Sequence, residues 1–377
     1  MNKKIAILTS GHPPYDERIF HKIGMTFLKY GYKVNIICST LKADKITEEI
    51  HLNGFDGSGL PVKEKIGRFI KLLSQFKPEK IICCEPVTLV AASVYKRISN
   101  SKVIVFADIT EWYPENVANK LHGVKRIITY LKLFLFNIYA VNLADALIIG
   151  EKAKLRRYKL IAPTKKKEII GYFPLLKYFN YSAPKFNGKS FTLCYAGLIS
   201  FERGIGRILE TAILLSQKLP DIKIRLKIAG KFQNDMEETQ FLAMIKPIKS
   251  VETIMIPWGD YRKISDTISD ADVCLDLRPR TFVYKHSLPI KIFEYMACGK
   301  PFIFSDIKPI RREMEADLYG FLVNPKKYDE ITDCLIKYIS DKELLLTHSK
   351  NARKKAEDDF NWEKLETRLI SFVESFD

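Results

Sequence analysis

The stretch HSLPIKIFEYMACGKPFIFSD, residues 286–306, predicts a short helix that runs into a buried strand. Ser287 is a good N-cap, and Pro289 fits the first helical turn because its missing N–H is not needed there. Gly299 is expected to end the helix in the left-handed conformation, and KPFIFSD is typical of a buried parallel strand. The N–H groups at the start of the helix suit an anion such as a phosphate. Five residues give the helix a broad apolar face: Ile290, Ile292, Phe293, Met296 and Ala297.

Glu294 places a carboxylate inside this otherwise apolar helix. Burying an unpaired carboxylate is costly, so the side chain needs a partner. A sugar or ribose diol that donates two hydroxyls to it is one explanation. The other is a glutamate on the surface, or one paired with the nearby Lys291, and the spacing alone leaves both open.

The composition favours a two-domain globular protein. A length of 377 residues predicts about two domains, and a hydrophobic content of 47% allows sizeable cores. No apolar run is long enough to span a bilayer, and the opening MNKKIAILTS turns polar too soon for a signal peptide. The seven cysteines include no CxxC pair, so we expect no disulfide framework, no metal site and a reducing cytosol.

The net charge of +17 is concentrated in the first half of the chain. Residues 1–180 hold 30 Lys and Arg against 15 Asp and Glu, whereas the remainder holds 31 against 29. Such asymmetry favours an anionic partner for the first half. No nucleic-acid module is visible, so we expect no nucleic acid and favour an anionic membrane surface. A solubilising excess of lysine is the alternative.

The chain opens with a β-loop-α-β pattern. The strand KIAILTS is followed by the loop GHPPYDERIF, a helix over about 18–29 and the strand YKVNIIC. The loop is not of the GxGxxG type, so a dinucleotide cofactor is not indicated. His12, Asp16 and Arg18 follow the first strand, at the edge where open α/β sheets bind ligands. A solvated loop with an Asp–Arg pair is the alternative.

Carboxylates follow a later strand of the same half. A helix over 63–76, the strand EKIICC and a helix over 88–97 precede the strand KVIVFAD, which ends at Asp108, with Glu111 just beyond it. Paired carboxylates at this edge suit a general base or the binding of sugar hydroxyls. Alternatively, Asp108 is only a cap and Glu111 is only solvated.

Residues 123–143 predict a long, very apolar helix whose only cations are Lys125, Arg126 and Lys132. It is expected to be a core or domain-edge helix, or else an interfacial membrane helix. After the strand DALIIG, residues 152–167 are strongly basic. Basic charge beside an apolar helix attracts anionic lipid, although a solvated positive face would have the same composition.

The second half repeats the alternation of strands and helices. Pro184, Asn187 and Gly188 break the periodicity, so residues 178–189 are predicted as a linker between a domain over 1–177 and one over 190–361. We expect an α/β protein with two doubly wound domains and a cleft between them, and a last helix over 362–377 that packs back on the first domain. Arg203, in the first βα loop of the second domain, is well placed for a pyrophosphate.

Five motifs occur in a familiar order: HPPYDERIFHK, YAGLISFERGIGRILETA, SLPIKIFEYMACGKPFIFSD, GFLVNPKKYDEI and FNWEKLE. Together they resemble the retaining glycosyltransferases of family 4 over nearly the whole chain. The resemblance implies the GT-B fold, in which two Rossmann-like domains face each other across a cleft. It also implies an acceptor domain in the first half, a donor domain in the second, a nucleotide-diphosphate sugar as co-substrate, and no metal or other cofactor.

The resemblance also assigns roles to individual residues. Glu294 matches the second glutamate of the donor signature, which holds the nucleotide ribose, and Arg203 matches a cation that grips the pyrophosphate. Three positions depart from the pattern. The first glutamate of the signature is His286 here, an arginine after Gly197 is Leu198, and a histidine before Glu111 is Thr110. Lys291 or Lys231 is expected to supply the lost cation, and His12 to replace part of the absent histidine.

The resemblance therefore implies a hexosyltransferase that retains the anomeric configuration, and the cysteine pattern predicts a cytoplasmic location. Its acceptor is expected to be a saccharide or lipid-linked saccharide of bacterial surface polysaccharide, at the inner face of the membrane. A non-catalytic binding subunit and a sugar-nucleotide epimerase of the same fold are the alternatives. Catalytic roles are assigned to Glu111, His12 and His286, and acceptor contacts to Asp16, Arg18 and Asp108. Donor contacts are assigned to Glu294, Arg203, Gly197, Ser287, Leu288, Ile290, Lys291, Lys231 and Trp258, the last with packing as an alternative.

Overall fold

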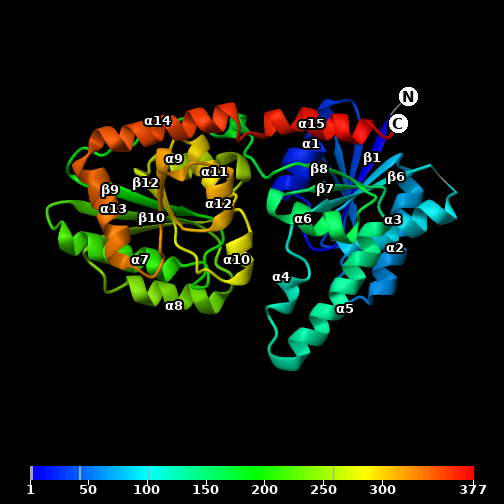
Figure 1. The fold of residues 1–377 in the computed structure, drawn as a ribbon, viewed down its shortest axis with the longest axis horizontal. Coiled ribbons are helices and arrows are strands. Elements are labelled where there is room, and N and C mark those ends of the chain that lie inside the picture. The colour runs from blue at the N-terminus through cyan, green and yellow to red at the C-terminus, as the bar shows by residue number, and fades with distance from the viewer. Residues whose placement is uncertain (1–2, 42–43, 101, 258) are drawn as a thin grey trace. The chain divides into compact units, whose positions relative to one another are not determined.

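The computed structural model describes residues 3–41, 44–100, 102–257 and 259–377. The chain divides into two compact units (Figure 1). Unit 1 comprises Met1–Tyr172 together with Glu363–Asp377, and unit 2 comprises Phe173–Trp362. The predicted α/β fold class, with two doubly wound domains, is confirmed, while the cleft between the domains stays a prediction.

Within the described part of unit 1, eight strands form one sheet in the order β3-β4-β2-β1-β5-β6-β7-β8. All neighbours pair in parallel except β3 and β4, which form an antiparallel hairpin at one edge. The strand order reverses direction between β1 and β5, and that switch point is where such sheets bind ligands. The strands are β1 (Lys4–Thr9), β2 (Lys33–Cys38), β3 (Lys45–Thr47), β4 (Ile50–Gly54), β5 (Lys80–Cys83), β6 (Ile104–Ile109), β7 (Ala146–Ile149) and β8 (Lys166–Ile169).

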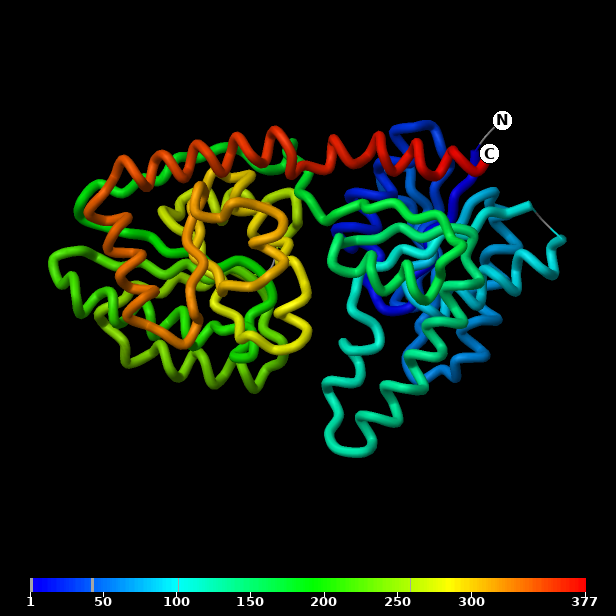
Figure 2. Tube along the Cα trace, in the orientation of Figure 1, coloured from blue at the N-terminus to red at the C-terminus, as the bar shows by residue number. Residues whose placement is uncertain are grey.

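Helices cover both faces of this sheet. The side chains of α2, α3, α5 and α6 share one apolar cluster with the strands. The N-terminal end of α5 and its connection to α4 extend away from the sheet, as the tube in Figure 2 shows. The helices of unit 1 are a π-helical turn η1 (Glu17–Gly24), α1 (Met25–Lys29), α2 (Val62–Phe76), α3 (Pro86–Ile98), α4 (Glu115–Ala118), α5 (Gly123–Asn142), α6 (Lys152–Ile161) and α15 (Trp362–Glu374).

The C-terminal helix α15 packs on unit 1, although it is far from that unit's strands in the sequence. Phe372 and Phe376 surround the ring of Phe106 on β6, with ring centroids 6.1 and 5.3 Å away. Glu374 receives a hydrogen bond of 2.6 Å from Lys3, near the start of β1. Helix α15 therefore covers the sheet face opposite to α2, α3 and α5.

Unit 2 contains a six-stranded parallel sheet, as far as it is described, in the order β11-β10-β9-β12-β13-β14. This is the strand order of a dinucleotide-binding fold, with its switch point between β9 and β12. Side chains alternate along β9, so that Leu193 and Tyr195 face one apolar cluster while Cys194 and Ala196 face the other. The strands are β9 (Ser190–Ala196), β10 (Lys223–Gly230), β11 (Val251–Pro257), β12 (Val273–Asp276), β13 (Phe302–Ser305) and β14 (Gly320–Val323).

Two helical layers enclose the sheet of unit 2. Helices α7, α8 and α13 contribute to one apolar cluster, and α9, α11, α12 and α14 contribute to the other. The helices are η2 (Leu176–Tyr178), α7 (Ile205–Lys218), α8 (Asp235–Ile245), η3 (Tyr261–Lys263), α9 (Ile264–Ser269), α10 (Phe282–His286), α11 (Lys291–Ala297), α12 (Lys308–Glu313), η4 (Ala316–Leu318), α13 (Tyr328–Ser340) and α14 (Lys342–Asp358).

The stretch over residues 286–306 differs from its prediction at the start. Ser287 is the C-cap of α10, in extended conformation, and α11 begins only at Lys291, so the expected N-cap role of Ser287 is wrong. The proline at 289 explains this, because the residue before a proline is disfavoured in the helical region. The end of the stretch is as predicted, since Gly299 has a φ of +69° and β13 pairs in parallel with β12 and β14.

Three other segments also differ from expectation. The predicted linker over 178–189 packs within unit 2, where Phe179 is buried and the Ser182 N–H donates to the Cys298 carbonyl. The β3–β4 hairpin was not expected, because its strands are only three and five residues long. The basic stretch over 152–167, for which no element was predicted, contains helix α6 and the start of strand β8.

Gly204 provides a test of how tightly the ends of β9 and β12 approach each other. It has a φ of +91°, and a Cβ there would lie 2.3 Å from the Leu277 carbonyl oxygen. Gly188 has a similar φ of +85° but open space around it. We expect Gly188→Ala to cost about 1 kcal/mol from backbone strain and Gly204→Ala about 2–3 kcal/mol more. Urea denaturation of unit 2 measures both, and equal losses would contradict the close approach.

Candidate functional site

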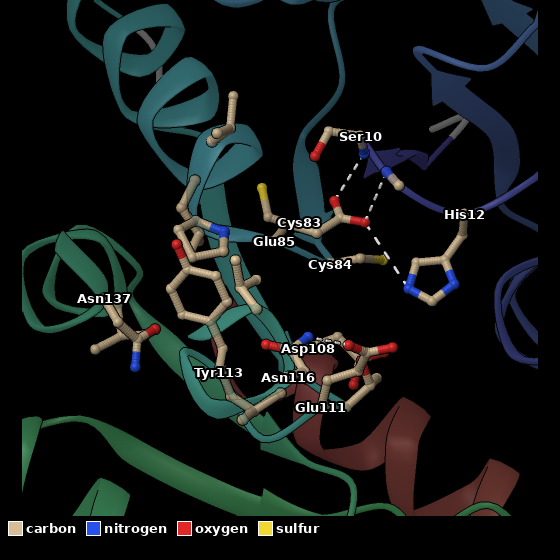
Figure 3. A pocket seen from close by; sticks show the side chains of 18 of the residues that line it. Ser10, His12, Cys83, Cys84, Glu85, Asp108, Glu111, Tyr113, Asn116 and Asn137 are labelled. Carbon is tan, nitrogen blue, oxygen red and sulfur yellow. Dashed lines mark hydrogen bonds and ion pairs between the residues drawn. The ribbon is translucent and has the colours of Figure 1, made fainter. Parts of the chain in front are cut away.

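Unit 1 contains a cavity of about 360 Å³ at the carboxyl ends of β1, β5 and β6 (Figure 3). Ser10, Gly11 and His12 line it after β1, Glu85 lines it after β5, and Asp108 and Glu111 line it at the end of β6. Tyr113 and Asn137 lie across the cavity from His12, beside apolar residues of α3, α4 and α5. The cavity therefore has a polar end at the switch point and a more apolar end.

Glu85 anchors the polar end. Its carboxylate accepts hydrogen bonds from the Thr9 hydroxyl and the Ser10 N–H, both over 2.7 Å, and from the Gly11 N–H over 3.1 Å. Burial raises the pKa of Glu85, although these donors and His12 oppose the rise. Sequence reasoning missed this residue. Its position at the end of a predicted strand, as for His12 and Asp108, was the signal that could have found it.

His12 lies between two carboxylates. Its Nδ1 is 3.2 Å from Asp16 Oδ2, and its Nε2 is 3.8 Å from Glu85 Oε1. The hydrogen bond that His12 donates to Asp16, together with the charges of Asp16, Glu85 and Glu111, raises the pKa of His12 to about 9 against the opposing effect of burial. His12 is therefore a cation at neutral pH in the free protein, suited to donating a hydrogen bond rather than accepting a proton.

Asp16 has a second role as the N-cap of η1. Its Oδ1 accepts hydrogen bonds from the backbone N–H groups of Arg18 and Ile19, over 2.9 and 3.1 Å. Burial would raise the pKa of Asp16, but His12 and these N–H groups lower it below its usual range. Asp16 thus orients His12 as well as the start of the helix, and a direct contact with an acceptor stays a prediction.

Arg18 and Asp108, predicted as acceptor contacts, form a buried ion pair with each other. The guanidinium donates to both oxygens of Asp108 over 2.7 Å and to the carbonyls of Ile170 and Gly171 over 3.0 and 2.9 Å. Arg18 is only 3% exposed and does not line the cavity, whereas Asp108 contributes to its wall. This arrangement favours a structural role for Arg18, which braces the end of β6 against the segment after β8.

Glu111 is exposed at the mouth of the cavity and accepts a hydrogen bond from Asn116. The loop that carries it is held by α6. Lys154 and Arg157 flank the ring of Trp112, with the Lys154 ammonium 5.8 Å and the Arg157 guanidinium 4.8 Å from its centroid. These two cations of the basic stretch therefore support the loop from within unit 1.

Unit 2 gathers charges at its own switch point. Arg278 forms a two-point ion pair with Asp276 at the end of β12, with one hydrogen bond of 2.8 Å. Burial would raise the pKa of Asp276, but Arg278 and Lys291 lower it. Sequence reasoning missed Asp276 and Arg278. Their spacing of two in VCLDLR, at the end of a buried strand, was the available signal.

Lys291 is buried beside this pair. Its Nζ has no hydrogen-bond partner within the described residues, lies 3.7 Å from Asp276 Oδ2, and sits 3.7 Å from the centroid of the Tyr195 ring. Desolvation lowers its pKa to about 7, with Arg278 and Arg203 adding to the effect against the pull of Asp276. Gly197, with a φ of +133°, makes room for it, because a Cβ there would lie 2.3 Å from Lys291 Cε.

The remaining predicted residues of unit 2 are the other donor contacts and His286, which was predicted as catalytic. Glu294 is buried one turn after Lys291, which excludes the interpretation as a surface glutamate, and Arg203 is close enough to affect the pKa of Lys291. His286 ends α10, with its Nδ1 2.6 Å from the Phe282 carbonyl, and Lys231 is exposed after β10. Ser287, Leu288 and Ile290 join α10 to α11, and Trp258 lies outside the described residues.

Neither a metal cluster nor a membrane span is found in the part of the chain that is described. No group of three or more His, Cys, Asp or Glu side chains is arranged to hold a metal ion there. Nor is any helix of that part both long and apolar enough to cross a membrane.

Comparisons with known proteins agree with this architecture. The model of the family Glycosyl transferases group 1 matches residues 180–355. Spore coat protein SA of Bacillus subtilis (strain 168) is 24% identical over 197 residues, which are 50% of this chain and 49% of that protein. The match thus spans about half the length of this curated relative.

Solved structures resemble the whole chain. A sucrose-phosphate synthase from Thermosynechococcus elongatus has a TM-score of 0.75 at 14% identity, over 99% of this chain and 98% of that one. HepE of Anabaena, in complex with UDP-glucose, has a TM-score of 0.69 at 13% identity, over 99% of each chain. At such identities the likeness shows the fold alone. The family model thus matches most of unit 2, and the chain as a whole has the GT-B fold.

Proposed function

We propose that the protein transfers a sugar from a nucleotide-diphosphate donor, bound by unit 2, to a hydroxyl of an acceptor bound by unit 1. The observation that carries the proposal is Lys291, a buried ammonium without a hydrogen-bond partner at the switch point of unit 2. One buried carboxylate, Asp276, faces two buried cations there, Lys291 and Arg278. A diphosphate would supply the missing negative charge, and the family match of residues 180–355 supports this assignment.

The cations would also assist the chemistry. As the bond to the sugar breaks, negative charge develops on the departing diphosphate, and preorganised cations stabilise such charge by several kcal/mol. Lys291 and Arg203 would contact the phosphates, with Gly197 allowing close approach. Glu294, one turn further along α11, would accept hydrogen bonds from the ribose hydroxyls. No metal or other cofactor takes part in this proposal.

The cavity of unit 1 would hold the acceptor. The protonated His12 would donate to an acceptor or sugar oxygen, and Glu111 would orient the attacking hydroxyl from the cavity mouth. Transfer would proceed with retention, the leaving phosphate accepting the proton of the attacking hydroxyl. The anomeric configuration of the product, determined by NMR, decides between retention and inversion.

The nature of the substrates is a further part of the proposal. The complex of Anabaena HepE with UDP-glucose supports a uridine-diphosphate hexose as the first donor to test. The basic first half of the chain supports a lipid-linked saccharide acceptor, as in bacterial surface polysaccharide, at the cytoplasmic face of the membrane.

Donor binding is tested by thermal denaturation with UDP, GDP, ADP, TDP and CMP. A ligand at about a hundred times its Kd stabilises the folded state by about 2.7 kcal/mol, so one diphosphate should raise the Tm by several degrees. Glu294→Ala should abolish the shift. Glu210→Ala, an exposed glutamate on α7 of the same unit, should retain it. If no diphosphate shifts the wild-type protein, donor binding by unit 2 is contradicted.

Lys291 makes diphosphate binding depend on pH. With a pKa of about 7 it is mostly neutral at pH 8.5, and a bound diphosphate would favour its protonated form. Binding should therefore take up about one proton at this pH, and the affinity should fall as pH rises from about 7 to 10. Calorimetry in two buffers of different ionisation enthalpy measures the uptake. It should vanish in Lys291→Met and persist in Lys231→Met, and the opposite pattern would assign the cation to Lys231.

His12 sets the alkaline limit of activity in this proposal. Because its pKa is about 9, kcat/KM should fall as pH passes that value and the imidazolium loses its proton. His12→Gln should lower turnover by about a hundredfold, remove this decline and leave diphosphate affinity unchanged. A decline that persists in the variant would show that another group controls it.

A further inference from the structure

Helix α5 exposes a continuous apolar stripe. Val124, Ile127, Ile128, Leu131, Leu135 and Tyr139 are each between 46% and 70% exposed. Their spacing of three and four residues places them on one face of the helix. We name this set the α5 stripe. Exposed apolar residues elsewhere, such as Met236 and Leu160, occur singly, which is normal for a protein surface, whereas a contiguous patch marks an interaction site.

The other face of α5 already has a function in the fold. Asn137, Ala140 and Val141 are buried. Ala140 and Val141 belong to the apolar cluster that α5 shares with α2 and α3, and Asn137 and Val141 line the cavity. The α5 stripe is therefore separate from the face that α5 contributes to the core. It points away from the sheet of the unit that carries it.

The charge around the stripe limits what can cover it. No Asp or Glu occurs between Glu115 and Asp145, a segment that contains Lys120, Lys125, Arg126 and Lys132. Lys125 and Lys132 are seven residues apart and border the stripe along one side, and both are exposed. A second copy of this chain would bring like charges together at this face. The stripe is complementary to a partner with an apolar interior and a negatively charged surface. An anionic lipid bilayer is such a partner.

We propose that the α5 stripe docks unit 1 on an anionic lipid bilayer, with the helix lying in the interface and its lysines at the headgroups. This agrees with the finding that no described helix is long and apolar enough to cross a membrane. The proposal stands without the proposed glycosyl transfer. If that function also holds, α5 has one face on the bilayer and the other on the acceptor cavity, which suits a lipid-linked acceptor.

Flotation of the full chain with vesicles of phosphatidylglycerol and phosphatidylcholine tests the docking. The wild-type protein should float with these vesicles at low salt, and float much less with phosphatidylcholine alone or at high salt. Leu131→Glu, in the centre of the stripe, should weaken binding at least about tenfold. Leu242→Glu introduces the same charge at an exposed leucine on α8 of unit 2 and should bind as the wild type does.

Two results would overturn the proposal. One is a wild-type protein that does not float with anionic vesicles at low salt, and the other is equal flotation of the two Leu→Glu variants. Circular dichroism of both variants verifies that they are folded. The double variant Lys125→Gln and Lys132→Gln is a second test, and it should lose binding to anionic vesicles only. Analytical sedimentation tests the competing occupant, a second copy of this chain. If the wild-type protein is a dimer that does not bind vesicles, and Leu131→Glu is a monomer, the second copy covers the stripe. A protein that floats but transfers no sugar would contradict only the proposed function.

Discussion

In a parallel sheet, a crevice (here called the gap) forms outside the carboxyl ends of two adjacent strands whose following helices turn to opposite faces. Both units of this protein are organised around such a gap. It lies between β1 and β5 in unit 1 and between β9 and β12 in unit 2. Backbone N–H groups and loop side chains converge there because the strands end together. In unit 1 they surround Glu85, and in unit 2 the bare Cα of Gly197 lets Lys291 reach the same position.

The two gaps have opposite electrostatic character. In unit 1, the carboxylates of Asp16, Glu85 and Glu111 surround a single imidazolium, an arrangement that offers many acceptors to a neutral polyol. In unit 2, Lys291 and Arg278 share the carboxylate of Asp276 in a desolvated site, an arrangement that favours an anion. This difference in charge between the two sites follows from their side chains rather than from the shared topology.

Much of the fold and part of the candidate site could be predicted from the sequence. The site residues that were missed or misassigned share one cause. Apolar runs separated by turn residues revealed both sheets, and the rule of strand ends located His12, Asp108 and Arg203. The sequence does not show whether an edge residue faces a ligand or another residue. Arg18 and Asp108, 90 positions apart, were expected to bind an acceptor but bind each other. Asp276 and Arg278 were not predicted as site residues. They form a charged site only together with Lys291, which lies on a separate helix.

The position of α15 has a consequence for the order in which the chain matures during synthesis. Unit 1 begins with the first strand, yet the aromatic rings that cover Phe106 come from the last residues. While the ribosome adds unit 2, the nascent first unit must keep that apolar surface exposed. Unit 2 becomes complete before unit 1 does. The N-terminal half is thus the part of this protein that completes its core last.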